Sequence, residues 1–128
     1  MKSVRVIGAA IAAALVTITA PAIAHPKLIS STPAAQATVT NATQVSLTFS
    51  ETLMAPVSGI DLAMTGMPGM ANHAPMKIAG FKTSVAADGK TLVAVFPRPL
   101  TAGTYKLAWH AVSTDTHRIT GTLAFTVR

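Results

Sequence analysis

Apolar and polar residues alternate along most of the chain from residue 44 onward, and this period of two is typical of strands with one buried face. In QVSLTFS, for example, Val45, Leu47 and Phe49 project to the same side. A short run farther upstream, KLIS, brings the number of predicted strands to seven. The predicted strands are KLIS (27–30), QVSLTFS (44–50), SGIDLAMTG (58–66), MKIAGFKTS (76–84), TLVAVF (91–96), GTYKLAWHAVS (103–113) and TGTLAFTVR (120–128).

Gly, Pro and Asx turns separate these runs, and no segment after residue 24 shows a sustained helical period. Asp88-Gly89 is a strong hairpin signal, and the run TLVAVF that follows it is apolar enough to be buried on both faces. Seven short strands in about a hundred residues predict an all-β fold, either a Greek-key sandwich or a small barrel.

The first 24 residues predict an exported protein. Lys2 and Arg5 precede an apolar run, and the segment closes with Ala22-Ile23-Ala24, a small-x-small pattern that a signal peptidase accepts. The apolar run is short for a membrane span, and no second one follows. We therefore expect a signal peptide over 1–24 and one domain over 25–128 that is not embedded in a membrane.

Charge and cysteine content narrow the function classes. Without Lys2 and Arg5, ten basic residues become eight against four acidic ones, a net charge of +4 that is scattered along the chain. No basic patch with interleaved aromatic residues is present, which argues against nucleic-acid binding. The cysteine count is zero, so a soft-metal site in this chain must use thioethers in place of thiolates.

The stretch MTGMPGMANHAPM, residues 64–76, is the most unusual part of the sequence, and we call it the methionine segment. Its residues from about 65 to 75 lack strand character, because Pro68, Gly69 and Pro75 interrupt regular structure. Thioether and imidazole are donors that copper(I) prefers. Alternatively, Met64 continues the inward alternation of the preceding strand and the others fill one end of the core. The candidate ligands are Met64, Met67, Met70, His73 and Met76.

A second group of donors has a different chemistry. Cleavage after Ala24 makes His25 the first residue, so its amine and imidazole can chelate one ion, while Pro26 offers no amide N–H for further backbone coordination. In Asp115-Thr116-His117, positions 115 and 117 project to the same side of an extended chain. Nitrogen and oxygen donors in a square arrangement suit copper(II). The alternative is an Asx turn with an exposed His117.

These motifs together resemble the periplasmic copper resistance protein C (CopC) family. The resemblance spans 25–128 and rests on HPKLISSTPA, LTFSETL, LAMTGMPGM followed by HAPM, LTAGTYKLAWHAVSTDTHRITG and the closing FTV. It implies a seven-stranded Greek-key β-barrel of the cupredoxin or immunoglobulin-like type, with two separated copper sites.

The resemblance also implies the ligands. The copper(II) site would use the amine and side chain of His25 with Asp115 and His117, and Glu51 would lie nearby without binding the ion. The copper(I) site would use His73 and three of Met64, Met67, Met70 and Met76.

The sequence therefore predicts a non-catalytic periplasmic copper carrier or chaperone for copper resistance or homeostasis, which passes the ion to other periplasmic or membrane copper-handling proteins. One rival is a copper monooxygenase that shares the N-terminal histidine chelate. It would need exposed aromatic residues, whereas alternation turns Tyr105 and Trp109 inward. A second rival is a metal-free β-sandwich interaction module, in which the methionines form an adaptable protein contact.

Overall fold

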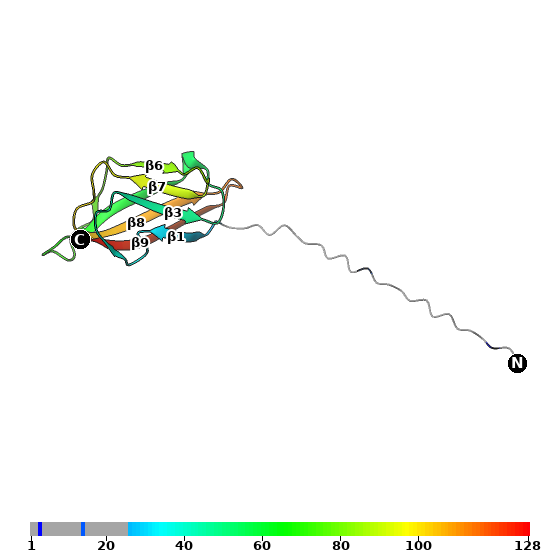
Figure 1. Cartoon of the computed structure of the whole chain (residues 1–128), viewed down its shortest axis with the longest axis horizontal. Helices are drawn as coiled ribbons and strands as arrows, with labels where there is room; N and C mark the ends of the chain where they lie inside the picture. Colours follow the sequence, from blue (N-terminus) through cyan, green and yellow to red (C-terminus); the bar gives the residue numbers. More distant parts are fainter. Residues whose placement is uncertain (1–2, 4–13, 15–25) are drawn as a thin grey trace.

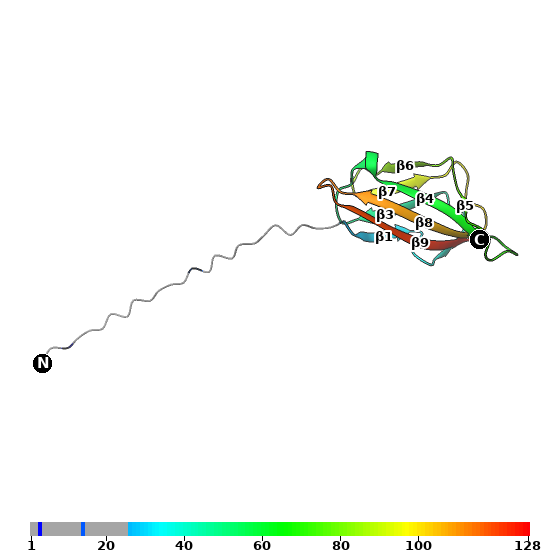
Figure 2. The same ribbon diagram turned by 180° about the vertical axis from the view of Figure 1, so that it is seen from behind.

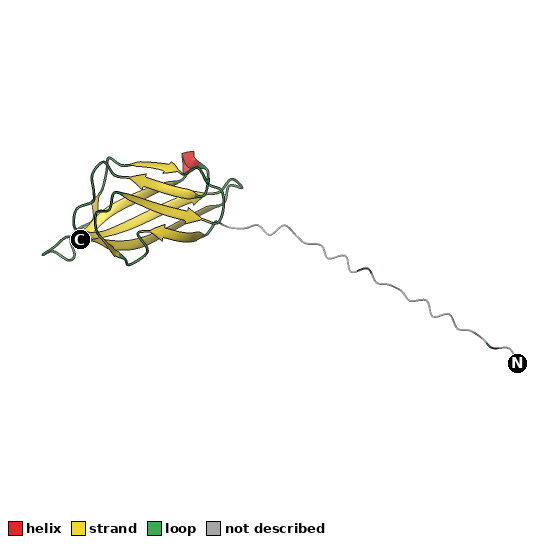
Figure 3. Ribbon diagram, viewed as in Figure 1, coloured by secondary structure: helices red, strands yellow, loops and turns green. Residues whose placement is uncertain are grey.

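The computed structural model describes residues 26–128, together with Ser3 and Ala14. The predicted signal peptide is otherwise outside the described residues, as is His25. Figure 3 shows that strands and loops make up nearly all of the described chain, with one short 3₁₀ turn, Ala55–Val57. Within this part of the chain, no helix is both long and apolar enough to cross a membrane.

Two β-sheets pack face to face. The four-stranded sheet has the order β1-β3-β7-β6, and the five-stranded sheet has the order β2-β9-β8-β4-β5, which faces the viewer in Figure 2. Adjacent strands are antiparallel except for β2 and β9, which are parallel. The strands are β1 (Leu28–Thr32), β2 (Thr38–Val39), β3 (Gln44–Phe49), β4 (Gly59–Gly66), β5 (Met76–Lys77), β6 (Lys82–Val85), β7 (Thr91–Val95), β8 (Gly103–Val112) and β9 (Arg118–Val127).

The core lies between the sheets and is formed by the inward set of each alternating run. Val45, Leu47 and Phe49 on β3 are fully buried and face the inward residues of β8 and β9. Tyr105 stacks on Phe125, and Trp109 meets Phe49 edge to face. This burial of apolar side chains from both sheets stabilises a domain that contains no disulfide. The all-β, Greek-key prediction is confirmed.

Two details of the strand prediction were wrong. The run 76–84 is not one strand: it is interrupted around Gly80, whose φ is +82°, so β5 joins the five-stranded sheet and β6 joins the other. Seven of the strands in the described region have four or more residues, and β2 and β5 add two residues each. The run TLVAVF is buried on one face only, because the side chain of Val95 points to solvent.

The predicted hairpin at Asp88-Gly89 is present between β6 and β7. The Oδ1 oxygen of Asp88 accepts hydrogen bonds from the amides of Lys90 and Thr91, at 2.9 and 3.0 Å. The hydrogen bond from the Thr91 hydroxyl, followed by these amide bonds, lowers the pKa of the Asp88 carboxyl.

The long hairpin of β8 and β9 defines two opposite ends of the sandwich (Figure 1). The methionine segment and the C-terminus lie at the end where β8 begins, since Gly66 pairs with Thr104 and Gly103 with Val127. The loop between the two strands, residues 113–117, lies at the other end. At about 3.3 Å per residue, the ten residues of β8 place these ends roughly 30 Å apart.

Candidate metal centres

The methionine segment folds back on itself as a short hairpin. Met67 and Met70 exchange two backbone hydrogen bonds of 2.9 Å, and the two residues between them, Pro68 and Gly69, form the turn. The φ of Gly69 is +82°, a value that L side chains rarely adopt and that a type II turn requires at this position. The expectation of a segment without strand character is therefore only partly met, because β4 continues to Gly66 and the bridge extends the pairing beyond it.

The four methionines of the segment differ in their exposure to solvent. Met64 is buried and belongs to the core, as the alternation of its strand allows, whereas Met67, Met70 and Met76 are exposed. Met64 and Met76 are directly opposite each other on β4 and β5, and Met67 is opposite Met70. Residues opposite each other in an antiparallel pair project to the same side, so each pair can bring two thioethers together.

His73 is tied to the base of this hairpin and carries an unusual nitrogen. Its amide donates to the Thr65 carbonyl oxygen at 3.0 Å, and its ring Nδ1 lies 2.7 Å from the Ala74 carbonyl oxygen. A carbonyl can only accept, so Nδ1 carries the proton and Nε2 carries a lone pair. That Nε2 atom is buried and has no hydrogen-bond partner among the described residues. A buried acceptor without a donor is rare, and a soft metal ion would satisfy it.

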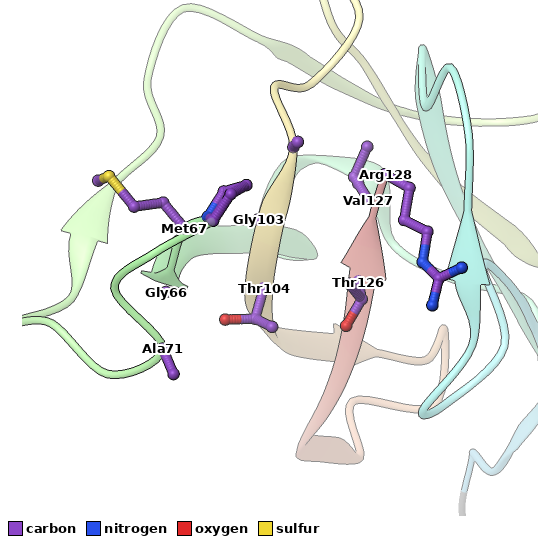
Figure 4. Close-up of a pocket in the computed structure, with 10 residues that line it drawn as sticks. Gly66, Met67, Ala71, Gly103, Thr104, Thr126, Val127 and Arg128 are labelled. Atoms are coloured by element: carbon purple, nitrogen blue, oxygen red, sulfur yellow. The ribbon is translucent and has the colours of Figure 1, made fainter.

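A hollow of about 520 Å³ lies beside the methionine segment, between the hairpin and the ends of β8 and β9 (Figure 4). Its lining is mostly apolar. In the view of Figure 4 the thioether of Met67 lies away from Thr104 and Thr126. Met67 is the single residue of this lining with a soft donor, so the lining offers one thioether to a metal ion. The lining residues are Gly66, Met67, Pro68, Ala71, Ala102, Gly103, Thr104, Thr126, Val127 and Arg128.

At the opposite end, the 113–117 loop brings Asp115 and His117 together. The Asp115 Oδ2 oxygen lies 2.9 Å from the Nδ1 nitrogen of His117. The chain is not extended here, because Thr116 has φ +73° and its amide donates to the Ser113 carbonyl oxygen in a tight turn. The turn at Thr116, and not strand alternation, therefore brings the side chains of Asp115 and His117 together, so the predicted extended conformation is wrong.

Ser113 fixes the conformation of this loop through hydrogen bonds. It was not among the site residues predicted from the sequence. Its buried hydroxyl donates to Asp115 Oδ1, which also accepts from the His117 amide at 3.3 Å. Its amide donates to the His117 carbonyl oxygen at 2.9 Å. The strand pattern could have identified Ser113, because a serine two residues after Ala111 occupies an inward position where an apolar residue is expected.

Hydrogen bonds keep the Asp115 carboxylate ionised. The Ser113 hydroxyl has the largest effect and His117 the next, and together they lower the pKa of Asp115 from 3.8 to about 2. The carboxylate is therefore negative over the whole physiological pH range. Asp115 and His117 thus offer an oxygen and a nitrogen donor side by side, which are donor types that suit copper(II).

The start of the described chain is fixed close to this loop. Pro26 is buried. The Lys27 amide donates to the Ser50 hydroxyl at 2.9 Å, and the Ser50 amide donates to the Lys27 carbonyl oxygen at 2.8 Å. Two residues further along, the Thr52 carbonyl oxygen accepts from the Thr114 amide at 3.1 Å. Segments 26–27, 50–54 and 113–117 thus converge at one end.

The remaining candidates for the nitrogen–oxygen site are Glu51 and His25. Glu51, between Ser50 and Thr52, is half-buried within the converging segments. His25 itself is outside the described residues, and within the described part of the chain no three His, Asp or Glu side chains cluster as metal ligands.

The fold and these two clusters define a small β-sandwich protein with sulfur and imidazole donors at one end and a carboxylate–imidazole pair at the other. Comparison with known proteins specifies the class further. The CopC domain family matches residues 28–128. The chain is 49% identical to copper resistance protein C of Escherichia coli over 107 residues, which cover 84% of each protein. It is 48% identical to copper resistance protein C of Pseudomonas syringae pv. tomato, covering 91% of this chain and 90% of that one.

Solved structures of copper resistance and CopC proteins have a similar fold. The crystal structure of PcoC, a methionine-rich copper resistance protein from Escherichia coli, has a TM-score of 0.74 at 47% identity and covers 82% of this chain and 100% of its own. CopC from Methylosinus trichosporium OB3b has a TM-score of 0.65 at 25% identity, covering 80% and 93%. The chain belongs to the CopC family, as its motifs predicted.

Proposed function

We propose that the mature chain, His25 to Arg128, is a non-catalytic copper carrier that is exported to the periplasm and serves copper resistance. Membership of a family whose named relatives are copper resistance proteins supports the metal and the role. The leader-like composition of residues 1–24 supports export and cleavage.

The observation that carries this proposal is the placement of two unlike donor sets at opposite ends of β8. Asp115 and His117, 2.9 Å apart, are oxygen and nitrogen donors, whereas the methionine segment presents thioethers and the Nε2 of His73, which has no hydrogen-bond partner among the described residues. One ion cannot contact both sets, since the length of β8 separates them by roughly 30 Å. A change in oxidation state would therefore move copper from one end to the other or to another protein.

At the copper(II) end, we assign the amine and imidazole of His25 together with Asp115 and His117. The fixed position of Lys27 against Ser50 supports the approach of His25 to the 113–117 loop. Glu51 stays near the site without binding the ion. The amine and the imidazole nitrogens must present lone pairs to bind copper(II), so binding releases protons and weakens as the pH falls.

At the copper(I) end, we assign His73 and three thioethers. Their exposure favours Met67, Met70 and Met76, because Met64 is held in the core. Thioethers do not titrate, so this site should depend on pH less than the copper(II) end does. Periplasmic or membrane copper-handling proteins would receive the ion from these ends.

Parallel titrations of the mature protein test the proposal. Copper(II) affinity is measured by chelator competition at about pH 7 and about pH 5.5, a range in which imidazole protonates, beside copper(I) affinity under the same conditions. We expect a large loss at the copper(II) end and a smaller one for copper(I). His117→Ala should abolish the first selectively, and Met54→Leu, outside the methionine segment, should change neither. Equal pH sensitivity for the two ions would contradict the assignment.

A further inference from the structure

The methionine segment combines metal donors with side chains that solvent reaches, and this sets its susceptibility to chemical modification. The exposed fractions are 55% for Met76, 53% for Met70 and 39% for Met67, against 7% for Met64. Met54, at the base of the 3₁₀ turn and outside the segment, is 37% exposed. Met67 and Met54 therefore have nearly equal exposure, although Met67 lies inside the candidate copper(I) site and Met54 lies outside it.

A thioether that solvent reaches is the usual target of methionine oxidation. Its sulfur attacks one oxygen of hydrogen peroxide; an S–O bond forms, the O–O bond breaks, and water leaves after a proton shift. The sulfur is oxidised by two electrons and the peroxide is reduced by two. The product presents a hard oxygen in place of a soft sulfur, and copper(I) binds such a donor poorly.

We propose that Met67, Met70 and Met76 form an oxidation-sensitive switch, in which sulfoxide formation by peroxide disables the copper(I) end while leaving the fold and the copper(II) end intact. The inference rests on the proposed function. It goes further by assigning a modification to particular side chains and by predicting that an oxidised carrier binds copper(II) alone.

Three features of the structure limit the loss of metal donors to one end. Met64 packs in the core beside the start of β8, so its sulfur is protected. The hairpin is held by backbone bonds between Met67 and Met70 and between His73 and Thr65, which sulfoxides do not remove. The donors of the 113–117 loop are oxygen and nitrogen and stand roughly 30 Å away along β8.

The first test follows oxidation residue by residue. Mature protein without metal is treated with hydrogen peroxide, and peptide mass spectrometry measures the sulfoxide fraction at each methionine over time. We expect Met70 and Met76 to oxidise fastest, Met67 and Met54 at similar intermediate rates, and Met64 at least about tenfold more slowly than Met70, because the reaction needs access to the sulfur. Equal rates at Met64 and Met70 would overturn the proposal.

The second test measures function on the same samples. Copper(I) capacity should fall in step with oxidation of the methionine segment, while copper(II) affinity changes less than about twofold, a factor well below 1 kcal/mol. Met54→Leu should leave this loss unchanged, and treatment with methionine sulfoxide reductases should restore copper(I) binding. Circular dichroism confirms that the oxidised protein stays folded, and unfolding in step with the loss would overturn the proposal.

A footprinting arm separates this inference from the proposed function. Silver(I), a soft ion that peroxide does not oxidise under these conditions, is bound before treatment, and sulfurs that ligate it should be protected while Met54 is not. If untreated protein binds neither copper(I) nor silver(I), the proposed copper(I) site is wrong. If untreated protein binds copper(I) and fully oxidised protein binds it equally well, the site stands and the switch is wrong.

Discussion

The Oδ2 oxygen of Asp115 lies 2.9 Å from Nδ1 of His117, while Oδ1 of the same carboxylate accepts from the Ser113 hydroxyl and the His117 amide. Both carboxylate oxygens are thus positioned by the 113–117 loop before any ion arrives. Loop donors held in this way do not have to be ordered when copper binds, which favours affinity.

Ser113→Ala should weaken copper(II) binding by about tenfold, the lower end of the effect of losing a group that orients a metal ligand. The substitution removes the buried donor that fixes Asp115 and leaves the candidate ligands themselves unchanged. Competition titration measures the loss. Thr114→Ala, an exposed neighbour in the same loop, is the control and should bind normally. A parallel loss of copper(I) binding would indicate a folding defect and contradict a local role.

Asp115 should also leave a signature in acid. Its pKa is depressed from 3.8 to about 2, so the ionised carboxylate stabilises the fold above 3.8 and this stabilisation is lost as the pH falls toward about 2. The difference in unfolding free energy between wild type and Asp115→Asn should therefore be constant from neutral pH down to about pH 4 and should shrink below it. Denaturant titrations of the metal-free proteins at several pH values measure it. A difference that already shrinks between pH 7 and pH 5 would place the titrating group elsewhere.

One residue added ahead of His25 should weaken copper(II) binding strongly, by about a hundredfold or more, because the free amine no longer closes a ring with the imidazole of the same residue. Copper(I) binding should be unchanged, since the methionine segment lies at the other end of β8. Isothermal titration of the extended and native mature forms makes the comparison. Unchanged copper(II) affinity would remove His25 from the site.

His73→Ala should reduce copper(I) affinity by about tenfold and lower stability by no more than about 1 kcal/mol, because the ring gives up a single hydrogen bond, the one to the Ala74 carbonyl oxygen. The stability cost is small because Nε2 is buried with no hydrogen-bond partner in the described chain, so removing the ring also deletes an unsatisfied acceptor along with the candidate ligand. Asn72→Ala serves as the matched control. Chelator competition and thermal unfolding are both required, and a large stability loss with intact copper(I) binding would make His73 structural.

Gly121→Ala should destabilise the domain by about 1 to 3 kcal/mol, the cost of overpacking a well-filled site. Gly121 is directly opposite Trp109 on β9 and β8, and a Cβ at position 121 would overlap the indole ring. Urea unfolding followed by the fluorescence of Trp109, the one tryptophan in the sequence, measures the change. Thr120→Ala, next to it on the strand, should have little effect. A neutral Gly121→Ala would mean that the indole can move aside.

Much of the fold could be predicted because strand alternation is a local property. The inward set on β3, Val45, Leu47 and Phe49, is buried as its spacing required, and so are Tyr105 and Leu107 on β8. The Asp88-Gly89 hairpin followed from its dipeptide alone. The division of 76–84 could not be predicted, because β5 pairs with β4 across the methionine segment whereas β6 pairs with β7 across the Asp88-Gly89 turn, and periodicity does not show which sheet each half of the run joins.

The sequence by itself determined which metal-binding donors the protein contains: thioethers and one histidine between residues 64 and 76, Asp115 and His117 farther along the chain, and no thiol. Composition and spacing suffice for that, since donor chemistry belongs to individual side chains. Only the tertiary structure decided that Met64 belongs to the core while three other methionines meet solvent, and that buried Ser113 orients Asp115. Burial and hydrogen bonding depend on what the rest of the chain places around each side chain, and local sequence does not encode that.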